Sequence, residues 1–156
     1  MSEQQVRSVA LFFFFIFLDG KKALDSSART VSRLKKLLNK SKTEISEIEL
    51  LAEVWSEFLS IRKNLQRGKP SYSTEGGWKI PQELDLGAWK EFQKNSPEAE
   101  LVIVVLNRIL DFKEEVISQA LQISLGTVRY RAGRGLRHLG SYTHTPKIGL
   151  RSVPRS

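Results

Sequence analysis

Four arginines stand two to three residues apart in the segment ISLGTVRYRAGRGLRHLG, residues 123–140, which contains no acidic residue. A guanidinium group can bind a phosphate, or the edge of a guanine, through parallel hydrogen bonds. The alternative is a solvated charged face, but exposed helices usually mix both signs of charge. The pattern therefore favours contact with a polyanion through Arg129, Arg131, Arg134 and Arg137.

The other residue types give little support for catalysis. The chain has no cysteine and two histidines, His138 and His144, which are too few for a histidine-based metal site. Its carboxylates lie at predicted helix starts or on amphipathic helices, and no nucleophilic triad, glycine-rich phosphate loop or paired-carboxylate pattern is present. We therefore expect a protein that is not an enzyme and that uses no cofactor, no metal and no small-molecule substrate.

Length and charge fit this expectation. A chain of 156 residues with 40% hydrophobic residues suits one medium domain or two small ones with a real core. The net charge of +8 and the pI near 9.9 favour either nucleic acid or an anionic membrane surface as partner. The lack of cysteine makes a reducing, cytoplasmic setting the default.

Three helices are predicted in the C-terminal half, and the third of them carries the arginines. Ser96-Pro97-Glu98 is typical of a helix start, with Ser96 as the N-cap, and EAELVIVVLNRIL continues as a helix buried on most sides. Asp111–Leu121 predicts a short second helix, and Ser124 is well placed to cap a third helix after a tight turn. Two short helices joined in this way form a helix-turn-helix, whose second helix lies in the major groove of DNA.

The third helix is expected to bury one face and to expose its arginines on or beside the opposite face. The predicted core residues are Val128, Ala132 and Leu136. Gly133 and Gly135 are expected to weaken this helix by about 0.5 to 1 kcal/mol each relative to alanine.

Base contacts come from the start of a recognition helix, so Thr127 and Arg129 are expected nearest to base edges or adjacent phosphates. Arg131 and Arg134 are expected to contact the DNA backbone. The complete set of candidate DNA-binding residues is Ser124, Thr127, Arg129, Tyr130, Arg131, Arg134 and Arg137.

Near the N-terminus, the apolar run Val9–Leu18 is about half as long as the roughly 20 residues that span a bilayer, so no membrane span is predicted. Its flanking residues, with Glu3 and Arg7 in front, do not fit a secretory signal. A helix that is apolar on nearly every face is most simply the centre of a small bundle, or a helix that docks on a partner. Membrane association through Phe12–Phe15 is a minor alternative.

Two further helices are predicted in the N-terminal half. Ala23–Asn39 has apolar residues at helical spacing and is separated from the first helix by a break at Asp19-Gly20. Thr43–Gln66 reads as a long helix capped by Ser41 or Thr43.

The domain organisation follows from the segments between these helices. Arg67–Asp85 gathers three glycines and two prolines without an apolar period, which predicts a linker. No strand is predicted, so the fold class is all-α, with two small helical domains, the second a helix-turn-helix. The predicted boundaries are a helical domain at 1–68, a linker at 69–95, a helix-turn-helix domain at 96–140 and a flexible basic tail at 141–156.

Residues 97–140, and the segment EEVISQALQISLGTVRYRAGRGLRHL most of all, resemble region 4 of bacterial RNA polymerase sigma factors of the extracytoplasmic-function type. Ser118 matches a small residue inside the first helix of the motif, Ser124 matches the capping serine, and Gly126-Thr127-Val128 match the residues that follow it. The turn position that is commonly glycine is Gln122, at a cost on the order of 1 kcal/mol if its φ is positive. The resemblance implies that Arg129, Arg131 and Arg134 face the upstream promoter element.

The segment ALFFFFIFLDGKKALDSSARTVSRL resembles a degenerate region 2, in which two helices separated by a short break bind the polymerase core. Where that family shows acid-x-x-Gln, Asp25 is followed by Ser26-Ser27-Ala28. Trp55–Lys69 is similar to the aromatic and basic strand-melting part of region 2. The candidate partner-binding residues are Phe13, Phe14, Asp25 and Arg29.

The resemblance implies promoter DNA, as double-stranded DNA, and the RNA polymerase core as partners, with an anti-sigma protein as a further candidate. It favours a sigma-like transcription initiation factor. The alternative is a polymerase-independent helix-turn-helix regulator whose N-terminal helices dimerise or bind a protein partner.

Overall fold

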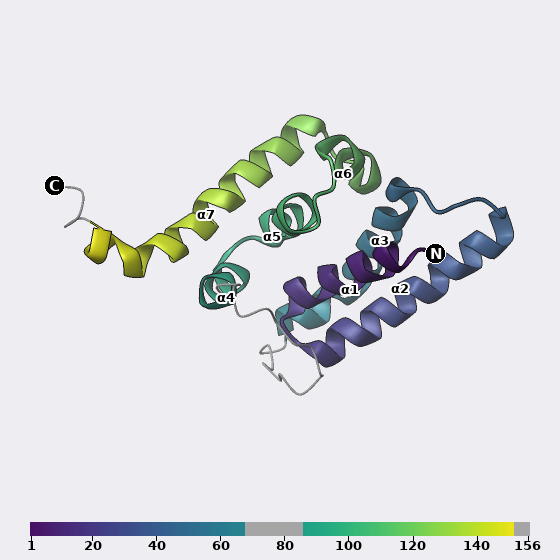
Figure 1. The fold of residues 1–156 in the computed structure, drawn as a ribbon, viewed down its shortest axis with the longest axis horizontal. Helices are drawn as coiled ribbons and strands as arrows, with labels where there is room; N and C mark the ends of the chain where they lie inside the picture. The colour runs from purple at the N-terminus through teal and green to yellow at the C-terminus, as the bar shows by residue number, and fades with distance from the viewer. Residues whose placement is uncertain (68–85, 152–156) are drawn as a thin grey trace.

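The computed structural model describes the backbone of residues 1–67 and 86–151, and the side chains of residues 1–62 and 86–142. All regular structure in these residues is helical, which confirms the all-α fold class. The elements are α1 (Glu3–Phe17), α2 (Gly20–Ser41), α3 (Glu47–Arg67), α4 (Leu86–Asn95), α5 (Glu98–Val104), the π-helical turn η1 (Val105–Ile109), α6 (Glu114–Leu121) and α7 (Leu125–Arg151) (Figure 1).

Helices α1 and α2 form a helical hairpin around the break predicted at Asp19-Gly20. Leu18 ends α1 in the left-handed conformation, with φ at 51°. The Asp19 carboxylate then caps α2 by accepting hydrogen bonds from the backbone N–H groups of Lys21 and Lys22, at 3.0 and 3.2 Å. The carboxylate satisfies two of the amides that a helix start leaves without partners, so the position of the break is confirmed.

The apolar run lies at the centre of the molecule, as the bundle interpretation predicted. Phe12 and Phe13 are 1% and 0% exposed, and their rings meet edge to face with centroids 5.1 Å apart. Phe58 of α3 also packs on Phe12, with centroids 6.3 Å apart. Each such buried side chain contributes roughly 1.5 to 3 kcal/mol. Within the described residues, no helix has the length and apolar character needed to cross a membrane.

Three predicted helix starts are corrected by the structure. Helix α3 begins at Glu47, where Ser46 and Glu49 form a reciprocal capping box with hydrogen bonds of 3.1 and 2.8 Å, so neither Ser41 nor Thr43 is its cap. Ser41 ends α2 instead, where its hydroxyl donates to a backbone carbonyl of that helix.

The other two corrections concern α5 and α6. Pro97 occupies the N-cap position of α5 without any side-chain cap, and the Ser96 hydroxyl is buried with no hydrogen-bond partner. Asp111 has a φ of 59°, so the second helix starts at Glu114 rather than at Asp111. A left-handed residue cannot continue a right-handed helix, which explains the later start.

Helix α4 was not predicted and lies within the segment assigned to the linker. Its Trp89 indole donates a hydrogen bond of 2.8 Å to the carbonyl of Phe15, and the two rings lie 5.5 Å apart. Phe92 is fully buried beside it. The rest of the predicted linker, residues 69–85, lies outside the described residues.

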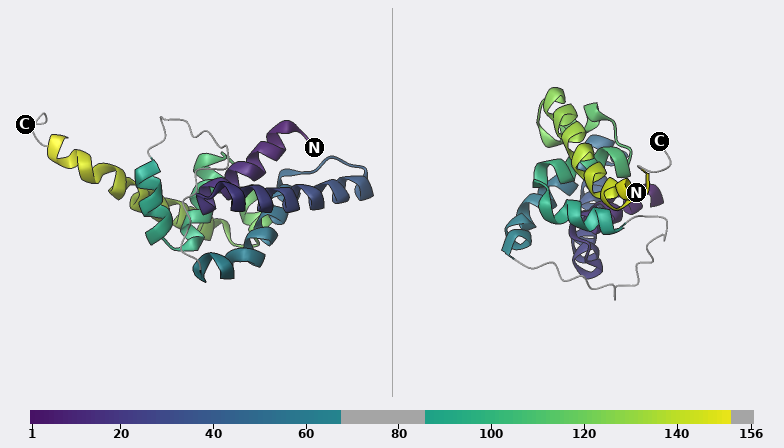
Figure 2. Two further views of the ribbon diagram at one scale, coloured as in Figure 1. Left: turned by 90° about the horizontal axis from the view of Figure 1, so that it is seen from below. Right: turned by 90° about the vertical axis from the view of Figure 1, so that its left-hand side faces the viewer.

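The N-terminal and C-terminal helices share one hydrophobic core. Helix α7 packs on α4, α5 and α6, while α3 packs on α6, and α1 on η1. In Figures 1 and 2, α7 and α2 lie on opposite sides of the molecule, and the last turns of α7 project beyond the other helices. The helical backbone continues past Gly140 to Arg151, through most of the segment for which a tail was predicted.

Candidate nucleic-acid interface

The turn between α6 and α7 is held by the small residue Ser118. Gln122 ends α6 in the left-handed conformation, with φ at 56°, as its place in the motif predicted. The backbone N–H of Ile123 donates to the Ser118 carbonyl at 3.1 Å, and the Ser118 hydroxyl donates to the Ile123 carbonyl at 2.6 Å. Both bonds offset part of the roughly 1 kcal/mol that a non-glycine residue loses at positive φ. Ser118 therefore fixes the angle at which α7 leaves the turn.

Ser124 caps α7, which confirms its predicted structural role. Its hydroxyl oxygen accepts a hydrogen bond of 3.1 Å from the backbone N–H of Thr127 and lies 2.7 Å from the Thr127 hydroxyl. Both side chains sit at the start of the helix, where unsatisfied amide groups favour anions. The first turn of α7 is thus suited to approach a phosphate.

The buried face of α7 differs in one position from the prediction. Val128 and Ala132 are buried as expected, but Leu136 is only half-buried, and Gly135 lies inside in its place. A Cβ atom at Gly135 would lie 2.5 Å from the Val104 Cγ2 atom of α5, a distance that side chains do not tolerate. Gly135, which was expected only to weaken α7, is thus the residue that lets α7 approach α5 closely.

The arginines of α7 meet acidic residues from other helices. The Arg129 Nε atom lies 3.2 Å from a Glu114 carboxylate oxygen of α6. The Arg134 Nε atom lies 3.0 Å from a Glu100 carboxylate oxygen of α5, and its guanidinium donates a further bond of 3.1 Å to the Tyr130 hydroxyl. The hydrogen bond that Arg134 donates to Tyr130 raises the pKa of Arg134 above its ordinary value, and the charge of Glu100 adds to this effect. The segment itself lacks acidic residues, but two of its arginines have acidic partners on other helices.

Glu100 is a buried carboxylate that sequence reasoning missed. It is 5% exposed and lies between Arg134 and His138, whose Nδ1 atom is 2.8 Å from the second carboxylate oxygen. That second contact lacks the alignment of a hydrogen bond, so it is an ion pair only when the imidazole is protonated. The signal in the sequence was a glutamate placed directly before the apolar run Leu101–Leu106, because a charge buried there needs a partner.

Four of the candidate DNA-binding side chains lie on one face of the first turns of α7. Tyr130 and Arg131 follow Thr127 by three and four residues, and Arg134 follows Tyr130 by four. Arg129 lies on another side of the helix, where it pairs with Glu114. Tyr130 is 61% exposed, and the side chains of Arg129 and Arg134 are about half exposed despite their ion pairs. No ion pair joins Arg131 or Arg137 to a carboxylate among the described side chains. The face combines guanidinium, hydroxyl and aromatic groups that can bind phosphates and base edges.

The N-terminal candidates lie in two different environments. Phe13 is 0% and Phe14 7% exposed, so both belong to the core in this structure. Asp25 and Arg29 lie on the surface of α2, where Arg29 pairs with the buried Glu57 at 2.9 Å. A partner that binds this unit as it is folded here would meet α2 rather than the phenylalanines.

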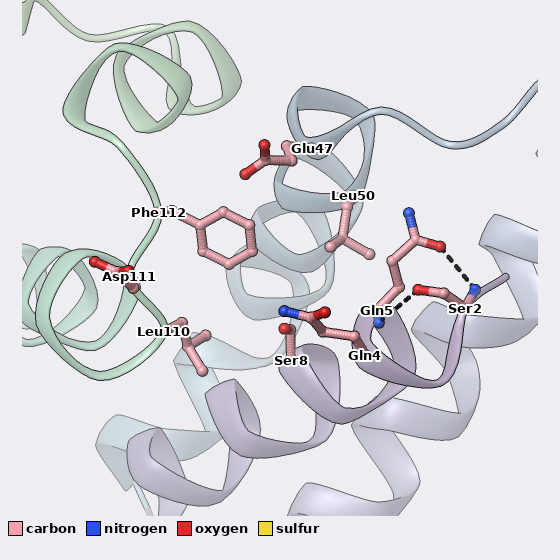
Figure 3. Close-up of a pocket in the computed structure, with 9 residues that line it drawn as sticks. All are labelled: Ser2, Gln4, Gln5, Ser8, Glu47, Leu50, Leu110, Asp111 and Phe112. Carbon is pink, nitrogen blue, oxygen red and sulfur yellow. Dashed lines mark hydrogen bonds between the residues drawn. The ribbon is translucent and has the colours of Figure 1, made fainter.

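An open pocket of about 260 Å³ lies between the start of α1, the start of α3 and the turn after η1 (Figure 3). Its polar lining includes Ser2 and Gln5, whose mutual hydrogen bonds cap α1. Glu47 and Asp111 are its acidic residues. Nowhere among the described residues do three or more metal-ligating side chains gather. The pocket therefore has the features of a junction between helix ends.

Residues 97–139 match the family model described as Sigma-70, region 4. The match begins at the start of α5, contains the whole helix-turn-helix and ends within α7. No curated protein and no solved structure matched the chain. The match identifies this segment as a sigma-like DNA-binding domain of transcription, a kind of domain that is not an enzyme.

Proposed function

We propose that the protein is a sigma-factor-like transcription initiation factor or regulator of the extracytoplasmic-function type. In this proposal α6 and α7 bind promoter DNA, and the helical domains bind the RNA polymerase core. The observation that carries it is the turn of Gln122 to Ser124, with its left-handed residue, its Ser118 anchor and its serine cap, inside the segment that matches region 4.

The exposed face of α7 supports the DNA contact. Arg131 and Arg137 have no acidic partner among the described side chains, whereas Arg129 and Arg134 are held by Glu114 and Glu100. A guanidinium that is half exposed and already oriented by an ion pair loses less conformational freedom on binding. Arg129 is nearest to the start of the helix, so we assign it to a base edge and Arg134 to the backbone.

The N-terminal helices are the proposed polymerase-binding unit, with Asp25 and Arg29 as contact residues. A cytoplasmic location follows from a role in transcription. An anti-sigma protein is a further proposed partner of the same unit, because a factor that binds polymerase through exposed side chains can be blocked at them.

A polymerase-independent regulator is the second candidate. Three apolar side chains on α2 and α3 favour it, since Leu24, Leu37 and Leu59 are 58%, 38% and 40% exposed. Such residues can contribute to a dimer interface. The absence of the usual glutamine after Asp25 favours it as well.

Co-purification with core polymerase separates the two candidates. The tagged protein is expected to retain the core subunits, and Asp25→Ala/Arg29→Ala is expected to weaken that retention while the protein stays helical. Monomeric behaviour in light scattering fits the first candidate. A dimer that binds a palindromic duplex and retains no polymerase would support the second.

The DNA contact is tested by fluorescence anisotropy with a selected duplex and a scrambled one. Arg129→Ala is expected to cost about 1 to 3 kcal/mol and to relax preference at one base position. Arg134→Ala is expected to weaken binding to both duplexes alike and to lower the salt slope by about one unit. Unchanged affinity of both variants for both duplexes would contradict the proposed role of α7.

A further inference from the structure

Helix α2 carries a second basic surface on the side of the molecule opposite α7 (Figures 1 and 2). The helix packs on α1 and α3, whereas α7 packs on α4, α5 and α6. Between Gly20 and Lys42 the only acidic residue is Asp25. The same segment contains eight basic residues, namely Lys21, Lys22, Arg29, Arg33, Lys35, Lys36, Lys40 and Lys42.

Three lysines form a row that we call the α2 stripe: Lys22, Lys36 and Lys40. All three are exposed. With about 3.6 residues per turn, positions fourteen or eighteen residues apart return to nearly the same face. The stripe from Lys22 to Lys40 is about 27 Å long, at about 1.5 Å per residue.

The acidic residues that face α2 do not neutralise the lysines of the stripe. Glu57 of α3 binds the Arg29 Nε atom at 2.9 Å, and Glu53 binds the Arg33 Nε atom at 3.1 Å. Among the described side chains, no ion pair joins Lys22, Lys36 or Lys40 to a carboxylate. The charge of these ammonium groups is therefore directed to the solvent.

The centre of the exposed face of α2 is polar. Ser32 and Asn39 are exposed there, beside the lysines, while the exposed Leu24 and Leu37 lie at its two edges. A helix that lies on a membrane needs large apolar side chains over a broad face. Short polar side chains instead let a rigid, charged backbone approach the helix and can hydrogen-bond to it.

We propose that the α2 stripe binds the phosphate backbone of double-stranded DNA, independently of base sequence and separately from α7. Double-stranded DNA presents one negative charge per about 1.7 Å of its axis, so a row about 27 Å long meets several phosphates. Lysine is a compact charge on a flexible chain, which suits phosphate contact without base reading. The inference goes beyond the promoter contact of α6 and α7 and does not depend on it.

The test compares two pairs of lysines with the same spacing. Lys36→Gln/Lys40→Gln removes two charges from the stripe, and Lys90→Gln/Lys94→Gln removes two from exposed positions of α4. Binding to a labelled duplex of random sequence is measured by anisotropy at several salt concentrations. The α2 variant is expected to lower the slope of log affinity against log salt by about two units, since each phosphate contact contributes about 0.9, while the α4 variant keeps the wild-type slope. Circular dichroism establishes that both variants are folded.

An unchanged slope in the α2 variant, or an equal loss in both variants, would overturn the proposal. It would also be overturned if the α2 variant lost binding to phosphatidylserine vesicles or to polyglutamate while its DNA slope stayed the same. Adding Arg131→Ala to the α2 variant should multiply the two losses in affinity, because separate surfaces act additively in free energy. If variants of α7 leave DNA binding unchanged and the α2 variant weakens it, the proposed function fails and this inference stands.

Discussion

The helices α1 to α3 pack through large side chains, whereas the helices α5 to α7 pack through a close approach of their backbones. In the first group, large aromatic rings fill the space, as where Phe58 meets Phe12 with centroids 6.3 Å apart. In the second, α7 approaches α5 at Gly135, where no side chain fits, and a buried carboxylate, Glu100, meets Arg134 beside it. An aromatic core tolerates substitutions that conserve its volume, whereas the close approach at Gly135 leaves no room for a single added carbon atom.

The largest effect is expected from a charge in the aromatic core. Phe13→Asp places a carboxylate where the side chain is 0% exposed, at a cost of several kcal/mol, and should abolish cooperative unfolding. Leu24→Asp, at a position that is 58% exposed, is the control and should unfold like the wild type. Thermal melts followed by circular dichroism measure both. A folded, stable Phe13→Asp protein would show that α1 is not the core of the molecule.

Two glycines of α7 offer a sharper comparison within the second group. Gly135→Ala is expected to destabilise the protein by about 1 to 3 kcal/mol, because its Cβ would lie 2.5 Å from Val104 Cγ2. Gly133→Ala should stabilise it by about 0.5 to 1 kcal/mol, since its Cβ would meet only Arg137 Nη1, at 3.6 Å.

Urea unfolding of the two variants measures the difference. Changes of opposite sign support the close contact between α5 and α7. If both substitutions stabilise the protein, the helices do not approach each other at Gly135, and the contrast with the aromatic core disappears.

Glu100→Gln tests the charged part of the same contact. It removes the ion pair with Arg134 while it keeps the shape of the side chain. The loss of stability is expected to be smaller than that of a fully buried pair, because Arg134 is about half exposed. The matched control is Glu114→Gln, whose partner Arg129 is 59% exposed and whose loss should be near zero. Equal losses from the two variants would mean that burial of Glu100 adds nothing.

The contrast between the two groups also explains what the sequence could predict. Two local patterns were found where they were expected. One is the buried run of phenylalanines in α1, and the other is the turn of the helix-turn-helix, with its left-handed Gln122 and its cap Ser124. The all-α class follows from the same helical periods. These features depend on neighbours in the sequence, which a single chain displays directly.

Features that depend on distant residues were missed. Gly135 reads as a weak helix residue until Val104 is placed against it, and Arg134 reads as unpaired until Glu100 is brought beside it. Helix α4 was missed because its short apolar pattern follows a segment rich in glycine and proline, and its Trp89 acquires meaning only through Phe15. Contacts between separate helices are set by tertiary packing, which local periodicity does not encode.

The smallest expected effect comes from two serine caps, one chosen from each group. Ser46 caps α3 and Ser124 caps α7, each through a hydrogen bond of 3.1 Å to a backbone N–H. Ser46→Ala and Ser124→Ala should each lower the free energy of unfolding by about 1 kcal/mol.

The effects of the two substitutions on DNA binding should differ, because only Ser124 lies at the start of the helix proposed to enter the major groove. Ser124→Ala is therefore expected to weaken binding to a selected duplex by more than its loss of stability explains, while Ser46→Ala leaves binding unchanged. Anisotropy titrations well below the unfolding temperature separate the two quantities. Equal DNA affinity of the two variants would mean that the cap of α7 serves only the fold, and that the start of this helix does not contact DNA.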